Sequence, residues 1–235
     1  MEPVVFLPGM MCDARLFGPQ IEALSRERSV MVAPTSVGER MEEIASNVLA
    51  AAPAKFALAG LSLGGIVAME VYRRAPERVT RIVLLDTNPV SETPERAAAR
   101  EPQIVKVKAG QLHAVMRDEM KPQYLARGPN RQAVLNLCMD MAESLGPDVF
   151  IRQSRALQRR RDQQPTLRKI KCPALVLCGE SDQLCPPDRH RFMAEMIPHS
   201  ELRIIEGAGH LPTLEKPEET LAILRGWLKQ PLVLR

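Results

Sequence analysis

The sequence predicts a doubly wound α/β fold whose sheet is mostly parallel. Six short apolar runs are typical of strands, and most are apolar at successive positions, as strands covered on both faces are. These runs span residues 3–7, 29–33, 55–59, 81–85, 174–178 and 201–205. Segments with helical spacing separate most of them, at residues 14–25, 39–51, 63–75, 186–196 and 216–229. Because strands that alternate with helices pair in parallel, we expect helices on both faces of the sheet.

Length and composition are those of one globular unit. The chain has 235 residues and a mass of 26.2 kDa, which is enough to bury one sizeable core. Its hydrophobic share of 45% and charged share of 26% are typical of soluble proteins. The formal net charge of +4 is small and dispersed, so nucleic acid is not an expected partner. The densest basic stretch, residues 154–162, predicts a solvated helix face, with attraction of an acidic partner or substrate as the alternative.

The N-terminal stretch and the cysteines indicate a cellular compartment. The stretch MEPVVFLPG has an acidic second residue and only four consecutive apolar residues, which matches neither a signal peptide nor a membrane anchor. The five cysteines include no CxxC pair, and an odd number is typical of free thiols in a reducing compartment. We therefore expect a cytoplasmic protein that does not act at a membrane. The sequence does not predict an oligomeric state.

Residues 89–169 interrupt the alternation of strands and helices. Strand signals are absent there, and Met, Leu, Ala, Arg and Gln dominate between prolines, so several short helices are predicted. An insertion of about eighty residues between parallel strands lies over their ends, where open α/β sheets bind ligands. We expect a core formed by residues 1–88 and 170–235 and a helical cap formed by residues 89–169.

A serine lies between glycines where the third strand ends and the next helix begins. The stretch Gly60-Leu61-Ser62-Leu63-Gly64 has the G-x-S-x-G spacing. Such a turn is so tight that side chains two positions from the serine would collide with the strand and the helix, and the two glycines remove them. The turn exposes the hydroxyl at a helix N-terminus, which favours a nearby anion. Ser62 is therefore the predicted nucleophile.

Two downstream loops contain the partners that such a serine needs. A serine hydroxyl is a weak nucleophile and requires a base that a carboxylate orients. The loop GESDQLCPP after the fifth apolar run contains Asp182, and the loop EGAGHLP after the sixth contains His210. We predict His210 as the base and Asp182 as the orienting acid. The other histidines do not end a strand, and we expect His190 and His199 on helix or turn surfaces.

Asp86 is an alternative acid. It ends the run at residues 81–85, so it lies on a neighbouring strand from which a carboxylate can also reach the histidine. Asp182 is favoured because its loop is next in chain order to the loop of His210. Asp86 instead runs directly into TNP at the start of the cap insertion, where an aspartate is suited to capping a turn.

The arrangement resembles the α/β-hydrolase fold superfamily over nearly the whole chain. The stretches GLSLGG, GESDQLCPP and GAGHLPTLEKPEE are similar in residues and spacing to its lactonase, esterase and carbon–carbon hydrolase branch. The resemblance implies that the backbone N–H groups of Met10 and Leu63 form an oxyanion hole. Pro8-Gly9 stands where the family usually has His-Gly, which changes what braces this loop. Because the first strand begins at residue 3, the antiparallel strands that begin most members are not expected, and the sheet is a reduced one.

These residues predict a serine hydrolase that cleaves a small ester or lactone through an acyl-enzyme, with no cofactor and no metal ion. A serine nucleophile argues against dehalogenase and epoxide hydrolase chemistry, which in this superfamily uses an aspartate. A carbon–carbon hydrolase acting on a ketone is an alternative within the fold, and a non-catalytic ligand-binding member is an alternative of another class. Methionines at helical spacing are more often core residues, but those near the serine and in the cap leave a small apolar pocket as an alternative; they are Met10, Met11, Met116, Met120, Met139 and Met141.

Overall fold

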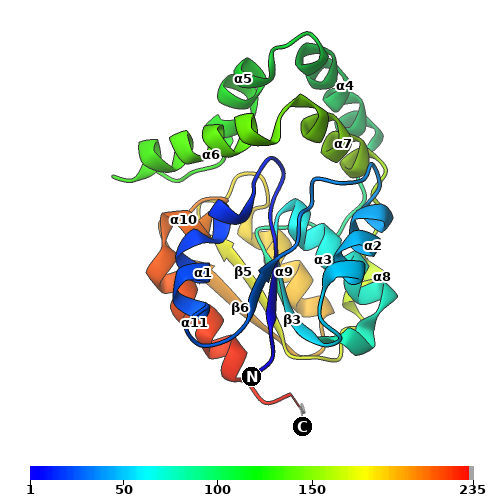
Figure 1. The fold of residues 1–235 in the computed structure, drawn as a ribbon, viewed down its shortest axis with the longest axis vertical. Coiled ribbons are helices and arrows are strands. Elements are labelled where there is room, and N and C mark those ends of the chain that lie inside the picture. The colour runs from blue at the N-terminus through cyan, green and yellow to red at the C-terminus, as the bar shows by residue number, and fades with distance from the viewer. Residues whose placement is uncertain (233–235) are drawn as a thin grey trace.

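The computed structural model describes residues 1–232, and within them six strands form one parallel sheet (Figure 1). The strands are β1 (Val4–Leu7), β2 (Val30–Val32), β3 (Phe56–Leu61), β4 (Val79–Leu85), β5 (Ala174–Gly179) and β6 (Ser200–Ile205). Their order across the sheet is β2-β1-β3-β4-β5-β6. The predicted fold class is confirmed, and each predicted run differs from its strand by at most two residues at either end.

Helices cover both faces of the sheet, because successive residues of the central strands enter two separate apolar clusters. On one face, Phe6 and Leu85 belong to the cluster that contains Trp227, and on the other, Leu58 belongs to the cluster that contains Val67. The first face is covered by η1 (Ala14–Phe17), α1 (Gly18–Leu24), α10 (Pro212–Glu215) and α11 (Pro217–Lys229). The second is covered by α2 (Met41–Ala51), α3 (Leu63–Arg74), α8 (Gln164–Leu167) and α9 (Pro187–Met196), and the short turn η2 (Pro76–Arg78) precedes β4. No helix in residues 1–232 combines the length and apolar character that crossing a bilayer requires.

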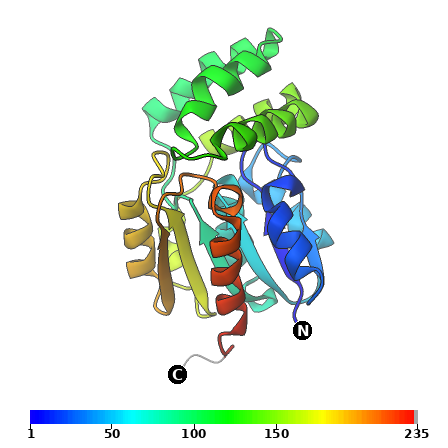
Figure 2. The same cartoon turned by 90° about the vertical axis from the view of Figure 1, so that its left-hand side faces the viewer.

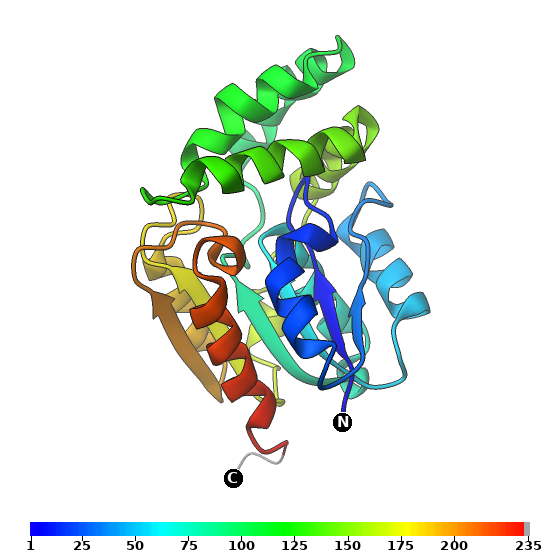
Figure 3. The same cartoon turned by 60° about the vertical axis from the view of Figure 1, so that its left-hand side comes forward.

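A further group of helices lies over the C-terminal ends of the strands (Figures 2 and 3). It comprises α4 (Pro94–Lys108), α5 (Leu112–Ala114), a π-helical turn η3 (Val115–Met120), a 3₁₀ turn η4 (Lys121–Gln123), α6 (Arg131–Leu145) and α7 (Pro147–Gln158). The helix α8 lies instead beside α3, where the Gln163 side chain donates a hydrogen bond to Glu70 at 2.9 Å. The division of the chain into a core and a cap at residues 88/89 and 169/170 stays a prediction.

The turn between β3 and α3 is possible only because glycines stand on both sides of Ser62. A Cβ on Gly64 would lie 1.9 Å from the carbonyl oxygen of Leu7. A Cβ on Gly60 would lie 2.2 Å from the carbonyl oxygen of Gly64. Real Cβ atoms do not approach other atoms so closely, and the atoms they would meet belong to the backbone. The N-terminus of α3 therefore packs directly against the end of β1.

We expect Gly64→Ala to destabilise the protein severely, because a backbone carbonyl cannot move aside as a flexible side chain can. The free energy of unfolding should fall by more than about 3 kcal/mol, measured by urea denaturation followed by circular dichroism. Gly226→Ala is the matched control, since Gly226 lies in α11 with no atom within 4 Å of an added Cβ. That change should raise the free energy of unfolding by about 0.5–1 kcal/mol. A Gly64→Ala protein as stable as the wild type would contradict this packing.

Candidate active site

Ser62 occupies the turn between β3 and α3 in a backbone conformation that residues with side chains rarely adopt. Its φ is 55° and its ψ is −116°, so the backbone is strained there. The N–H of Ser62 donates to the carbonyl oxygen of Leu85 at 2.9 Å. The hydroxyl of Thr87 donates to the carbonyl oxygen of Ser62 at 2.6 Å. These contacts hold the Ser62 side chain at the N-terminus of α3, in the wall of a cavity.

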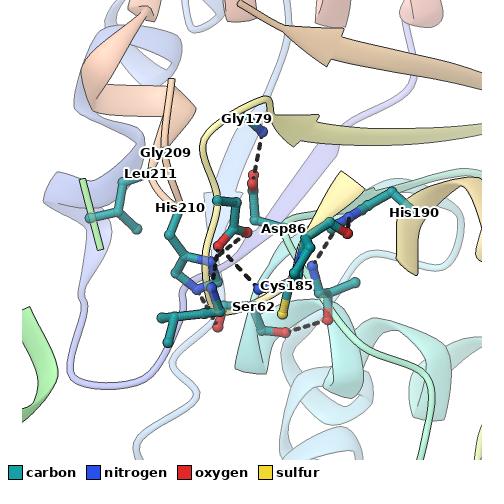
Figure 4. A network of polar contacts seen from close by, with 12 residues as sticks. Ser62, Asp86, Gly179, Cys185, His190, Gly209, His210 and Leu211 are labelled. Atoms are coloured by element: carbon teal, nitrogen blue, oxygen red, sulfur yellow. Dashed lines mark hydrogen bonds and ion pairs between the residues drawn. The ribbon is translucent and has the colours of Figure 1, made fainter. Parts of the chain in front are cut away.

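His210 joins Ser62 to Asp182 through two hydrogen bonds (Figure 4). Its Nε2 lies 3.0 Å from Oγ of Ser62, and its Nδ1 lies 2.8 Å from Oδ2 of Asp182. Ser62 follows β3, Asp182 follows β5 and His210 follows β6, so the three side chains meet at the C-terminal edge of the sheet. The structure thus brings together the three residues that the loop motifs indicate. Because Asp182 accepts a hydrogen bond from the N–H at Nδ1, Nε2 carries no proton and can accept one from the serine hydroxyl.

Asp182 is a buried carboxylate that several donors surround. Its Oδ1 accepts hydrogen bonds from the backbone N–H of Leu184 at 2.8 Å and of Cys185 at 3.0 Å, while its Oδ2 faces His210. Burial by itself raises the pKa of Asp182, but the neighbouring His210 and the hydrogen bonds outweigh burial and hold that pKa below its ordinary value. Asp182 is therefore ionised at neutral pH, in the state that orients the imidazole.

Asp86, the alternative acid, makes no hydrogen bond to His210. It is fully buried, with a φ of 43°, and its Oδ1 accepts from the N–H of Gly179 at 2.9 Å. Its Oδ2 finds no donor among the described residues. Burial raises the pKa of Asp86 well above its ordinary value, and the nearby Asp182 carboxylate raises it further. Of the two aspartates, the structure places only Asp182 against the imidazole.

Two contacts that sequence reasoning misses hold the loop of His210 in place. The backbone N–H of His210 donates to the carbonyl oxygen of Tyr124 at 2.6 Å, and the Tyr124 ring lies 5.6 Å from the imidazole. The carboxylate of Glu215 accepts from the N–H groups of Gly209 and Leu211, both at 3.0 Å. A tyrosine carbonyl has no sequence signal. The contact of Glu215 could have been suspected from the sequence, because Glu215 lies in the same stretch as His210, GAGHLPTLEKPEE.

Met10 and Leu63, the predicted oxyanion donors, lie near Ser62. Both residues line the same cavity as the serine. Leu63 is the first residue of α3, so its N–H has no acceptor within the helix. The N–H of Met10 likewise donates no hydrogen bond to another residue of the described chain. Two unengaged N–H groups beside a hydroxyl are suited to binding an oxyanion.

Gln153 of α7 braces the loop that contains Met10. Its Oε1 accepts a hydrogen bond from the N–H of Met11 at 2.8 Å, and its Nε2 donates to the carbonyl oxygen of Thr35 at 3.1 Å. The Gln153 side chain is fully buried, and Met11 has a φ of 55°. In this chain, which has Pro8 in place of the usual histidine, the brace therefore comes from a helix above the sheet. Sequence reasoning misses Gln153, because the contact joins segments far apart in the chain.

The cavity beside Ser62 has a volume of about 430 Å³, and its lining is partly charged. Of the six methionines, only Met10 and Met120 line it. Met11, Met116 and Met141 are instead buried in the core. The walls contain five charged residues, which are Glu92, Arg96, Arg100, Glu119 and Arg160. Three of these methionines thus follow the core alternative, and the lining is not the apolar one that the pocket alternative implies.

His190 is buried, contrary to its expected place on a surface. Its Nε2 accepts from the N–H of Thr87 at 3.1 Å, and its Nδ1 donates to the carbonyl oxygen of Pro186 at 3.2 Å. Burial lowers the pKa of His190 to about 4, so the ring is neutral. The expectation fails because α9 packs against β5 and β6, and its His190 meets Thr87, two residues after the end of β4. His190 therefore positions Thr87, which in turn holds the carbonyl of Ser62.

Asp182, Cys185 and His210 are the described residues whose potential metal-ligand atoms lie within 4.8 Å of one another. Asp182 and His210 are already hydrogen-bonded to each other. Burial also raises the pKa of the Cys185 thiol, which disfavours the thiolate that a metal ion requires. The arrangement suits proton transfer from Ser62 better than metal binding.

Curated relatives of this chain include esterases. A pimeloyl-[acyl-carrier protein] methyl ester esterase from Aromatoleum aromaticum is 27% identical over 199 residues, with 80% of this chain and 79% of that protein covered. The biotin biosynthesis bifunctional protein BioHC from Teredinibacter turnerae is 27% identical over 255 residues, with 97% of this chain covered. This chain spans only 44% of that longer protein.

Solved structures and a family profile extend the comparison to almost the whole chain. A thermophilic esterase from Thermogutta terrifontis superposes with a TM-score of 0.89 at 28% identity, covering 97% of this chain and 90% of that one. The profile of the alpha/beta hydrolase family matches residues 4–223, a range that includes Ser62, Asp182 and His210. The chain belongs to the alpha/beta hydrolase family.

Proposed function

We propose that this alpha/beta hydrolase cleaves a small carboxylic ester or lactone, with Ser62, His210 and Asp182 as its catalytic triad. The observation that carries the proposal is the unbroken hydrogen-bond chain from Oγ of Ser62 through His210 to Asp182, in the wall of a cavity. The esterases among the relatives support a hydrolase that acts on ester bonds. The experiment that tests the proposal is hydrolysis of a panel of esters and lactones, with cleavable diketones as the carbon–carbon alternative.

The first half of the reaction forms an acyl-enzyme. Nε2 of His210 takes the proton from Ser62 as Oγ attacks the carbonyl carbon, and Asp182 stabilises the imidazolium that results. The carbonyl oxygen becomes an oxyanion between the N–H groups of Met10 and Leu63. When the tetrahedral intermediate collapses, His210 returns the proton to the departing alcohol, and the acyl group remains on Ser62.

The second half of the reaction releases the acid. Water enters in place of the alcohol, and Nε2 of His210 removes its proton as it attacks the acyl carbon. The same two N–H groups hold the second oxyanion, and collapse returns the proton to Oγ of Ser62. Ser62 and His210 end the cycle in their starting protonation states, so no cofactor is consumed.

Removing the nucleophile or the base should abolish most of the activity. Ser62→Ala and His210→Ala should each lower kcat on p-nitrophenyl butyrate by about 10⁴- to 10⁶-fold, because the triad acts as a unit. A fluorophosphonate probe should label the wild type and spare Ser62→Ala. The control is Ser181→Ala, which changes an exposed serine beside Asp182 and should leave labelling intact. Equal labelling of the wild type and Ser62→Ala would rule out Ser62 as the nucleophile.

The two aspartates should differ sharply when each is changed to the isosteric amide. Asp182→Asn should lower kcat by about 10⁴-fold, because the imidazole loses the partner that fixes its tautomer. Asp86→Asn is the matched control and should cost far less, since burial already raises the pKa of the Asp86 carboxyl toward the uncharged form and Asn can still accept from Gly179. The measurement is steady-state kinetics of both variants on one ester. If the two costs are reversed, Asp86 is the acid of the triad.

Gln153→Met should lower kcat by about 10- to 100-fold with little change in KM, because a loosened Met10 loop weakens a contact made only in the transition state. Gln158→Met in the same helix is the matched control. The Gln158 amide bonds to Ala97 and Glu101, away from the Met10 loop, so this change should leave kcat unaltered. A rise in KM with unchanged kcat for Gln153→Met would show that Gln153 acts on substrate binding instead.

A further inference from the structure

The cavity that contains Ser62 has an excess of positive charge in its wall. The charged residues that line it are Glu92, Arg96, Arg100, Glu119 and Arg160. Glu119 is balanced from outside the cavity by Lys106, whose Nζ lies 2.7 Å from the Glu119 carboxylate. Three arginines therefore face a single remaining carboxylate, that of Glu92.

Arg100 already forms an ion pair with Glu92. Its Nε and Nη2 donate to the two carboxylate oxygens of Glu92 at 2.5 Å and 3.1 Å, which is a bidentate pair. Nη2 of Arg160 lies 3.5 Å from Oε1 of Glu92, longer than a charge-assisted hydrogen bond. Arg96 forms no ion pair with any residue from 1 to 232. Arg160 is therefore an additional cation beside a carboxylate that is already paired.

The guanidinium of Arg160 is buried, and its long ion pair with Glu92 leaves part of its hydrogen-bonding capacity unused. Its side chain is only 6% exposed, and its Nε has no hydrogen-bond partner among the described residues. Burial lowers the pKa of Arg160, and the nearby Arg100 also lowers it, although Glu92 opposes both effects. A buried charge with unused donors costs free energy unless an anion completes its hydrogen bonds. The cavity is the place from which such an anion can reach it.

We propose that Arg160, with Arg96 and Arg100 beside it, binds a carboxylate of the substrate at a distance from the ester that Ser62 attacks. This inference rests on the proposed esterase function. A carboxylate suits the site because it matches the planar fork of a guanidinium. A phosphate dianion would be repelled more strongly by Glu92.

The proposed substrates are short esters with a free carboxylate. Half-esters of dicarboxylic acids have the carboxylate on the acyl side, and esters of hydroxy acids have it on the alcohol side. A cavity of about 430 Å³ holds either kind when the chain is short. Both kinds are therefore included in the test.

Two pairs of esters test this proposal. Monoethyl adipate is compared with ethyl hexanoate, and 6-acetoxyhexanoate is compared with hexyl acetate, by titrating the acid released. The wild type should show a higher kcat/KM for the anionic ester in at least one pair. Arg160→Gln should lower kcat/KM for that anionic ester by about 10- to 100-fold more than for its neutral partner, because a hydrogen bond between charged groups is lost.

Arg159→Gln is the matched control, since it removes the same charge from the adjacent residue. The Arg159 side chain is 45% exposed and pairs with Glu39 at 3.5 Å, outside the cavity. This change should leave the ratio between anionic and neutral esters unaltered. Equal losses on both esters in Arg160→Gln would overturn the proposal, and so would a preference of the wild type for the neutral ester in both pairs.

Binding to Ser62→Ala separates this proposal from the proposed catalytic function. Calorimetry with monoethyl adipate and 6-acetoxyhexanoate should give a Kd for one of them that is about 10- to 100-fold weaker in Ser62→Ala/Arg160→Gln than in Ser62→Ala. If the wild type is neither labelled by a fluorophosphonate nor active on any ester, the catalytic proposal fails, and this binding difference still decides the carboxylate site. If labelling and neutral-ester hydrolysis are present but the two Kd values are equal, the carboxylate site alone fails.

Discussion

The close approach of Gly64 to the end of β1 determines where the other groups of the site can lie. Because no Cβ separates Gly64 from the carbonyl oxygens of Leu7 and Pro8, the N-terminus of α3 sits directly against the loop that follows β1. That loop contains Met10, and the first N–H of α3 belongs to Leu63. One backbone contact therefore places the strained serine turn and both proposed oxyanion donors side by side, although they come from separate parts of the chain.

The parallel sheet then brings the remaining polar groups of the site to the same edge. Two of them are carboxyl groups, and a negative charge on one disfavours a negative charge on the other. Asp86 directly follows β4 and Asp182 follows β5, so two buried carboxyl groups lie near each other, and the charge of Asp182 raises the pKa of Asp86. The Asp182 carboxylate accepts hydrogen bonds from Leu184, Cys185 and His210. The Asp86 carboxyl accepts one, from the N–H of Gly179. The larger number of donors lowers the pKa of Asp182 and so favours a carboxylate beside the imidazole.

Local signals explain which parts of this structure are predictable from sequence. The strands are apolar runs bounded by turns, and Ser62, Asp182 and His210 each stand in a loop whose residues indicate a strand end. Gln153 was not predictable, because its contact with Met11 spans 142 residues. The burial of His190 was missed for a related reason. The face of a helix that turns inward depends on what packs against it, and one segment does not contain that information.

The helices above the sheet contribute to the geometry of the site as well as to its walls. Gln153 of α7 holds the loop of Met10, and the carbonyl of Tyr124, in the segment before α6, holds the backbone of His210. Arg160, just after α7, lines the cavity. A substrate anchored on Arg160 therefore contacts the same segment that braces the proposed oxyanion donors. Binding energy gained at Arg160, away from the ester, can in this way hold the reacting groups in position. The same contacts of the helices above the sheet would then both select the substrate and organise the site.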